Sequence, residues 1–150
     1  MKKLIFSVIA LAILTISCSK SDSDPANEQL PFTVQNLAGV WYIKEFIKLD
    51  NTATPYKKVG CATKRDFVTF GFDRSIESTI HLPNCNFGNL YSSLSYSFND
   101  GSNEMIGCHQ YYGGLATITR STLRIDYKIE NDVREMNGNT PVKAIILTRQ

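Results

Sequence analysis

The residues best able to do chemistry in this chain are its cysteines and histidines. Beyond the N-terminal segment the cysteines are Cys61, Cys85 and Cys108, and the two histidines are His81 and His109. Residues of these types form disulfides, ligate metal ions or act as a nucleophile with its base. Which of these uses applies depends on the strands that hold the residues and on whether the chain is exported.

A disulfide is the expected state of paired cysteines outside the cytoplasm. Cys61 precedes a predicted strand at 65–72, and Cys85 follows a predicted strand at 76–82. Because the two outer ends of a hairpin lie at the same end of a sheet, this order favours a Cys61–Cys85 bridge, which would contribute about 3 kcal/mol. Cys85–Cys108 is the competing pair. If Cys61 pairs with Cys85, we expect Cys108 to be a buried free thiol in mid-strand.

A zinc site would have to combine His81 and Cys85 with Cys108 and His109. Neighbouring residues on a strand point to opposite faces, so Cys108 and His109 do not both reach one ion without a bulge. We therefore expect no metal. The sequence also has no Gly-x-Ser-x-Gly, His-Glu-x-x-His or phosphate-loop motif. We expect no catalytic residues, no cofactor and no enzyme activity.

The N-terminus has the pattern of an export signal. A positive start at 1–3 precedes an apolar stretch at 4–16, which is short for a membrane span. We predict a signal peptide over residues 1–17, with a retained anchor helix as the alternative. The run at 14–18 resembles a bacterial lipobox, although Thr15 stands where that motif prefers Leu. The resemblance implies a lipid on Cys18, and ordinary signal cleavage is the alternative.

Residues 18–31 are polar and contain one lysine and three acidic residues. We predict a lipidated Cys18 followed by a flexible tether. Asp22 and Asp24 resemble the acidic export signals of some surface lipoproteins, and a plain soluble linker is the alternative reading. The expected localisation is therefore the cell envelope, with a lipid anchor in the outer membrane and the membrane face left open.

The composition and charge of the chain limit the classes of partner that it is expected to bind. The chain has 150 residues, 43% hydrophobic and 20% charged, which fits one domain at 32–150. Without Lys2 and Lys3, which lie in the signal peptide, fourteen basic residues face fourteen acidic ones. A neutral chain of this kind gives no reason to expect nucleic acid or a polybasic membrane patch.

Period-two alternation of apolar and polar residues dominates the domain. Its best example is 122–129, where Leu123, Ile125 and Tyr127 alternate with polar residues. The expected strands are 40–47, 65–72, 76–82, 93–98, 104–110, 115–119, 122–129 and 142–149. About eight short antiparallel strands predict an all-β fold, a single up-and-down β-barrel, with a two-sheet sandwich as the runner-up.

The first predicted strand opens with Gly39-Val40-Trp41, on the only tryptophan of the chain. A Gly-x-Trp at this point resembles the start of a lipocalin-like domain, as in bacterial lipoproteins, and the resemblance covers about residues 36–150. It implies a barrel in which Arg149 of the last strand packs on Trp41 as a structural pair. A Thr-Asp-Tyr loop signature typical of that family is not evident.

The same resemblance implies that the barrel holds a small hydrophobic molecule. Strand phase gives the inward candidates for contacting it, and the same residues would equally describe a filled core: Phe70, Phe72, Tyr96, Phe98, Ile125 and Tyr127. The alternative function is a filled, non-catalytic barrel that contacts an envelope partner through its loops. Tyr111 and Tyr112 would then line that contact, or else cover the end of the core.

Overall fold

The computed structural model describes residues 27–58, 60–98, 101–106, 111–128, 133–136 and 138–149, with side chains at 89–93 excepted. The predicted signal peptide, the predicted lipidation site Cys18, and the residues Cys108 and His109 lie outside the described residues. So does most of the predicted tether.

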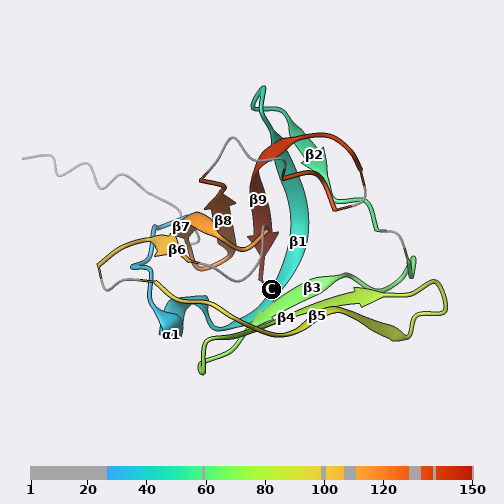
Figure 1. Ribbon diagram of the computed structural model, residues 1–150, viewed down its shortest axis with the longest axis horizontal. Helices are drawn as coiled ribbons and strands as arrows, with labels where there is room; N and C mark the ends of the chain where they lie inside the picture. The colour runs from blue at the N-terminus through green and yellow to red at the C-terminus, as the bar shows by residue number, and fades with distance from the viewer. Residues whose placement is uncertain are drawn as a thin grey trace, which may run out of the picture.

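The described chain is built almost wholly of antiparallel strands (Figure 1). One short helix, α1 (Val34–Leu37), precedes them. The strands are β1 (Gly39–Lys48), β2 (Ala53–Pro55), β3 (Phe67–Phe70), β4 (Ser75–His81), β5 (Phe87–Ser95), β6 (Glu104–Met105), β7 (Gly114–Ile118), β8 (Thr122–Asp126) and β9 (Val142–Thr148). The predicted all-β class is confirmed.

The strands form one curled sheet in up-and-down order. Its path runs β5-β4-β3-β1-β9-β8-β7-β6, and β2 adds to β1 beside it. The first long strand thus pairs with the last, as an up-and-down barrel requires. Just beyond β5 and β6, Ser97 and Ile106 form a bridge with two backbone hydrogen bonds, 3.2 and 2.7 Å. The sheet therefore curls into a half-barrel, and the single-sheet prediction is confirmed over the sandwich.

Strand lengths differ from the prediction where turn chemistry intervenes. β3 ends at Phe70, two residues early, because Gly71 N donates to Ser75 O at 2.8 Å to form a tight turn. Asp73 Oδ1 accepts from the Ser75 backbone N at 3.0 Å and so fixes that turn. β2 was not predicted, since three residues carry too little alternation to be recognised.

The folded part begins earlier than residue 32. Leu30 N donates to Ile118 O at 2.8 Å, so the end of the predicted tether pairs with the end of β7. Asn36 Nδ2 also donates to Pro31 O at 2.8 Å. α1 follows, capped by Thr33, whose hydroxyl accepts from Asn36 N at 3.2 Å. These contacts attach the chain directly to the barrel before its first strand.

Candidate functional site

The end of the barrel next to α1 is closed. Trp41 is fully buried, and its Nε1 donates to Leu37 O in α1 at 2.7 Å. The guanidinium carbon of Arg149 lies 3.9 Å from the Trp41 ring centroid, and Arg149 also donates to Asn36 O. The predicted Trp41–Arg149 contact is confirmed. Burial lowers the pKa of Arg149 from its ordinary value, yet its stacking and hydrogen bond hold it in place.

In the described part of the chain, the interior holds aromatic rings that contact one another. Phe70 lies 5.7 Å from Tyr96 and 6.2 Å from Tyr112, centroid to centroid. Tyr112 is fully buried and shares a hydrogen bond with Ser78 Oγ at 3.2 Å. Tyr111, at 6.5 Å from Tyr112, continues the series toward β1. Tyr111 and Tyr112 therefore cover and fill the core, as one of the two sequence readings expected.

Five of the six predicted ligand contacts belong to this packed core or lie against it: Phe70, Tyr96, Phe98, Ile125 and Tyr127. The inward orientation predicted for Phe72 is wrong. Phe72 lies beyond the end of β3, in the turn that Gly71 begins, and its side chain is 75% exposed. The alternation that would have pointed it inward stops at Phe70.

Three of these residues, Phe70, Tyr96 and Phe98, lie at the end of the sheet next to α1. Phe70 pairs with Gly39, the first residue of β1 after α1. Tyr96 stacks on Phe98 at 6.2 Å, and Phe98 meets Phe32, just before α1, at 4.9 Å. Burial raises the pKa of Tyr96 above its ordinary value. Phe70, Tyr96 and Phe98 therefore belong to a cluster of rings beside α1.

Tyr127 follows β8, at the opposite end. Burial, with the phenols of Tyr112 and Tyr111 nearby, raises the pKa of Tyr127 well above its ordinary value. Its buried hydroxyl has no hydrogen-bond partner among the described residues. Tyr127 thus stays neutral at physiological pH and contributes a phenol to the core rather than a charge.

β1 changes partners midway along one edge. Tyr42 pairs with β3, whereas Glu45 already pairs with β2. On the other edge the register against β9 shifts between Ile43 and Glu45, which makes Lys44 an extra, bulged residue. The chain that joins β2 to β3 therefore leaves β1 near Glu45 and returns to β1 near Tyr42. We call this place the fork.

Three hydrogen bonds hold the fork together, two of them to β1 and one between the chain that follows β2 and the chain that precedes β3. Tyr56 N donates to Lys44 O at 2.8 Å, and Ile43 N donates to Asp66 O at 3.4 Å. The Tyr56 hydroxyl then donates across the fork to Asp66 Oδ2 at 2.7 Å. Position 66 is in phase with Val68 and Phe70, so strand alternation could have identified Asp66 as an inward carboxylate. Sequence reasoning missed it.

Asp66 is 3% exposed, and both of its oxygens are occupied. Oδ1 accepts from the His81 backbone N at 2.8 Å and lies 3.3 Å from His81 Nδ1, while Oδ2 accepts from Tyr56. A buried carboxylate needs such partners because its desolvation is costly. Asp66 therefore ties the end of β4 to the fork, and His81, a zinc candidate by sequence, is committed to this pair.

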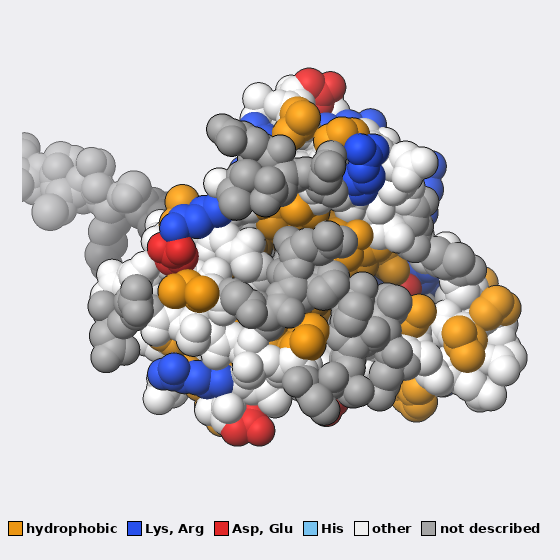
Figure 2. All heavy atoms as spheres, viewed as in Figure 1, with side chains coloured by type: hydrophobic (Ala, Val, Ile, Leu, Met, Phe, Trp, Pro, Cys, Tyr) orange, Lys and Arg blue, Asp and Glu red, His pale blue; other side chains and the backbone are white. Residues whose placement is uncertain are grey.

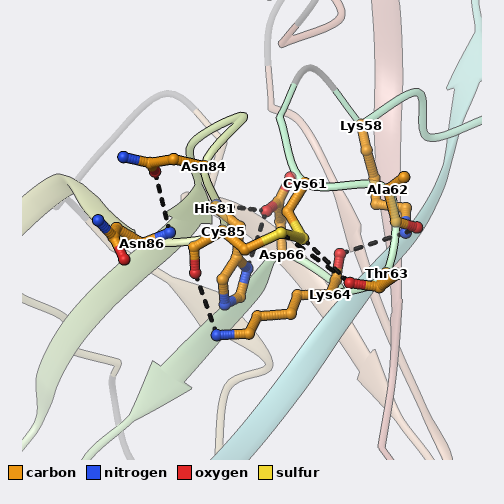
Figure 3. The surroundings of a disulfide bond; sticks show 10 residues. All are labelled: Lys58, Cys61, Ala62, Thr63, Lys64, Asp66, His81, Asn84, Cys85 and Asn86. Carbon is orange, nitrogen blue, oxygen red and sulfur yellow. Dashed lines mark hydrogen bonds and ion pairs between the residues drawn. A yellow bond between two sulfur atoms is a disulfide. The ribbon is translucent and has the colours of Figure 1, made fainter.

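A disulfide holds the loop of the fork against the β4–β5 turn, as Figure 3 shows. Cys61 and Cys85 are bonded, with their Cα atoms 4.8 Å apart, so the favoured pairing is confirmed. Cys61 N donates to His81 O at 3.2 Å, and Lys64 Nζ donates to Cys85 O at 3.0 Å. A Cβ on Gly60 would lie 1.5 Å from His81 O, so only glycine permits this close approach.

An open pocket of about 230 Å³ lies in the fork. Its lining combines apolar, phenolic and charged side chains: Ile43, Lys44, Tyr56, Lys58, Arg65 and Asp66. We call it the fork pocket. A second space of about 10 Å³ beside Phe46, Tyr56 and Glu135 has room for about one water molecule. The fork pocket is the larger of the two spaces. Two of its lining residues, Tyr56 and Asp66, are hydrogen-bonded to each other, and Asp66 is also hydrogen-bonded to His81.

The turn between β4 and β5 carries exposed apolar side chains. Leu82 is 41% and Phe87 is 67% exposed, and we call these two residues the tip patch. Lys64 Nζ lies 5.3 Å from the Phe87 ring centroid. Figure 2 shows hydrophobic side chains on the surface over this projecting turn. The tip patch is a surface that a protein partner could cover.

The zinc hypothesis loses its ligands in the described part of the chain. Cys85 is in the disulfide and His81 is paired with Asp66. No group of three or more His, Cys, Asp or Glu side chains suited to a metal ion occurs among the described residues. Nor does any helix in the described ranges have the length and apolarity needed to cross a membrane.

Comparison of the chain with protein-family models, with curated proteins and with solved structures found no match in any of the three.

Proposed function

We propose that this chain is a non-catalytic envelope lipoprotein whose lipocalin-like barrel binds a small molecule in the fork pocket rather than in its interior. The observation that carries the proposal is the contrast between the two spaces. Phe70, Tyr96 and Tyr112 occupy the interior with ring-to-ring contacts, while the fork pocket is open and about 230 Å³ in volume. We therefore propose a small ligand in the fork pocket in place of the hydrophobic ligand that the sequence analysis expected inside the barrel.

The fork is suited to binding because its walls are held before any ligand arrives. Asp66 is hydrogen-bonded to Tyr56 and His81, and the disulfide fixes the chain between β2 and β3 at Cys61. Walls fixed in this way lose little conformational entropy when a ligand binds. Because the fork pocket is open to the surface, a ligand can enter it without any opening of the barrel.

The tip patch favours a second candidate function, contact with an envelope protein. Leu82 and Phe87 lie at the turn that the disulfide fixes to the fork loop. Exposed apolar side chains on a rigid turn can anchor a partner. The first function predicts that a small molecule co-purifies with the protein, and the second predicts that another protein does, so one experiment separates them.

That experiment is native mass spectrometry of the Cys18→Ala chain, exported to the periplasm of its own host and purified gently. We expect a reproducible small added mass that solvent extraction removes. Lys58→Trp, which fills the fork pocket, should abolish it, and the neighbouring exposed Lys57→Trp should not. A co-purifying protein without a small mass would favour the second function. Bare protein would contradict both.

A lipid on Cys18 is part of the proposal, and it predicts where the protein resides. The wild-type chain should incorporate labelled palmitate and fractionate with the outer membrane. Cys18→Ala removes the thiol to which the lipid would be attached, so it should release the protein into the periplasm with the barrel intact. Ser17→Ala, next to the same site, serves as the matched control. Membrane retention of Cys18→Ala would contradict the anchor.

A further inference from the structure

We infer that the fork pocket binds a compact organic oxyanion, a carboxylate or a phosphate, and that Lys58 and Arg65 hold its charge. The inference rests on the proposed function and specifies the ligand class. It starts from charge. Three of the six lining residues are cationic, and the one carboxylate, Asp66, has both oxygens occupied by Tyr56 and His81.

Lys58 brings a cation to the pocket with its position already fixed. Its Nζ donates to Ala62 O at 2.9 Å and to Lys64 O at 3.2 Å, both within the fork loop. These acceptors are neutral carbonyls, so the ammonium charge is not compensated by them. An ammonium has three donors, which leaves one for a ligand.

Arg65 is fixed in a similar way. Its guanidinium carbon lies 4.3 Å from the Tyr42 ring centroid, and Nη2 donates to Thr148 Oγ1 at 3.4 Å. Neither contact neutralises it, and in the described part of the chain neither Arg65 nor Lys58 has a carboxylate partner within salt-bridge distance. Arg65 lines the fork pocket, and a planar guanidinium matches the geometry of a carboxylate or a phosphate.

Lys44 contributes less than the other two cations. It is ion-paired with Glu45 at 3.1 Å, which offsets its charge. Its backbone matters more, because the bulge at Lys44 opens the fork and its carbonyl receives Tyr56 N. The ligand's charge should therefore depend on Lys58 and Arg65 and only weakly on Lys44.

The remaining lining limits the size of the ligand. Ile43 is buried and Tyr56 presents a ring, so the pocket has an apolar wall beside its cations. A volume of about 230 Å³ lies below the roughly 300–1,000 Å³ of pockets for drug-sized ligands. The pocket therefore fits an oxyanion on a small ring or a short chain, and a long acyl chain exceeds it.

The test is an NMR titration of the unlipidated mature chain, Cys18→Ala, with benzoate and with its neutral isostere benzamide. Benzoate should shift the amide signals of Ile43, Tyr56 and Asp66 saturably, and benzamide should not. Arg65→Gln and Lys58→Gln should each weaken binding about tenfold, as expected for a lost hydrogen bond to a charged group. Lys57→Gln changes the net charge equally outside the fork pocket and should leave the affinity unchanged.

Further arms identify the source of the oxyanion and check the fold. Inorganic phosphate and vesicles of phosphatidylglycerol are tested beside benzoate, so that a response to vesicles alone assigns the oxyanion to a lipid headgroup. Arg65→Lys should regain part of the affinity, and unchanged thermal unfolding of each variant excludes misfolding. Equal binding of benzamide would overturn the oxyanion and leave the fork as a small-molecule site. No response to any probe would overturn both proposals.

Discussion

Replacing Tyr112 by alanine should lower the free energy of unfolding by about 3–5 kcal/mol, the range for truncating a buried aromatic side chain. Tyr112 is fully buried, and its ring lies between Phe70 and Tyr111 in the interior. Truncation leaves a cavity that these neighbours cannot close without moving strands of the sheet. Equilibrium urea unfolding of wild type and variant measures the difference as a shift of midpoint.

Tyr112→Phe separates the ring from the hydroxyl. It keeps the ring in the interior and removes the hydrogen bond shared with Ser78 Oγ, 3.2 Å long and buried. We expect a loss of about 1 kcal/mol for that bond. If Tyr112→Ala cost no more than Tyr112→Phe, the ring would not be filling the barrel, and the description of the interior would be wrong.

Removing the disulfide should have the second largest effect. The Cys61→Ala, Cys85→Ala double variant frees a loop whose ends are 24 residues apart in sequence, and about 3 kcal/mol of stability should be lost. Cys61 also lies between Lys58 and Arg65 in the chain that joins β2 to β3, so benzoate affinity should fall as well. Loss of stability is measured by urea unfolding and loss of affinity by NMR titration.

Reducing the wild-type protein provides the matched comparison, because it breaks the same bond without changing the side-chain volume as much. Reduced wild type and the double variant should agree in stability to within experimental error. A double variant as stable as the oxidised protein would show that the bond is incidental to the loop. In that case Asp66, through Tyr56 and His81, would be holding the fork by itself.

Several features of the fold could be predicted from local patterns. Alternation at Leu123 and Ile125 identified β8, and the Gly39-x-Trp41 start identified the first strand. The contact of Trp41 with Arg149 was expected from the resemblance to lipocalin-like domains and not from a local pattern. The Cys61–Cys85 pairing followed from the order of strands, because a hairpin brings its outer ends together. The two strands and the disulfide each depend on residues close in sequence or on a simple topological rule.

The fork, in contrast, could not be predicted from local sequence patterns. It arises because β1 exchanges β3 for β2 on one edge and bulges at Lys44, and neither event leaves a pattern in the sequence. Phe72 was placed inward because alternation does not show where a strand ends. Only Asp66, in phase with Val68, carried a readable signal of a buried carboxylate.

We propose that aromatic rings fill the interior and that ligands bind in the fork pocket instead. Uptake of the neutral apolar probes benzene and 1-decanol, followed by NMR, tests this most directly. Wild type and Tyr112→Phe should show no saturable shifts at Phe70 or Ile125. Tyr112→Ala should bind benzene in its new cavity, as engineered apolar cavities do. Saturable uptake by wild type with shifts at Phe70 and Ile125 would contradict the claim and return the ligand to the barrel.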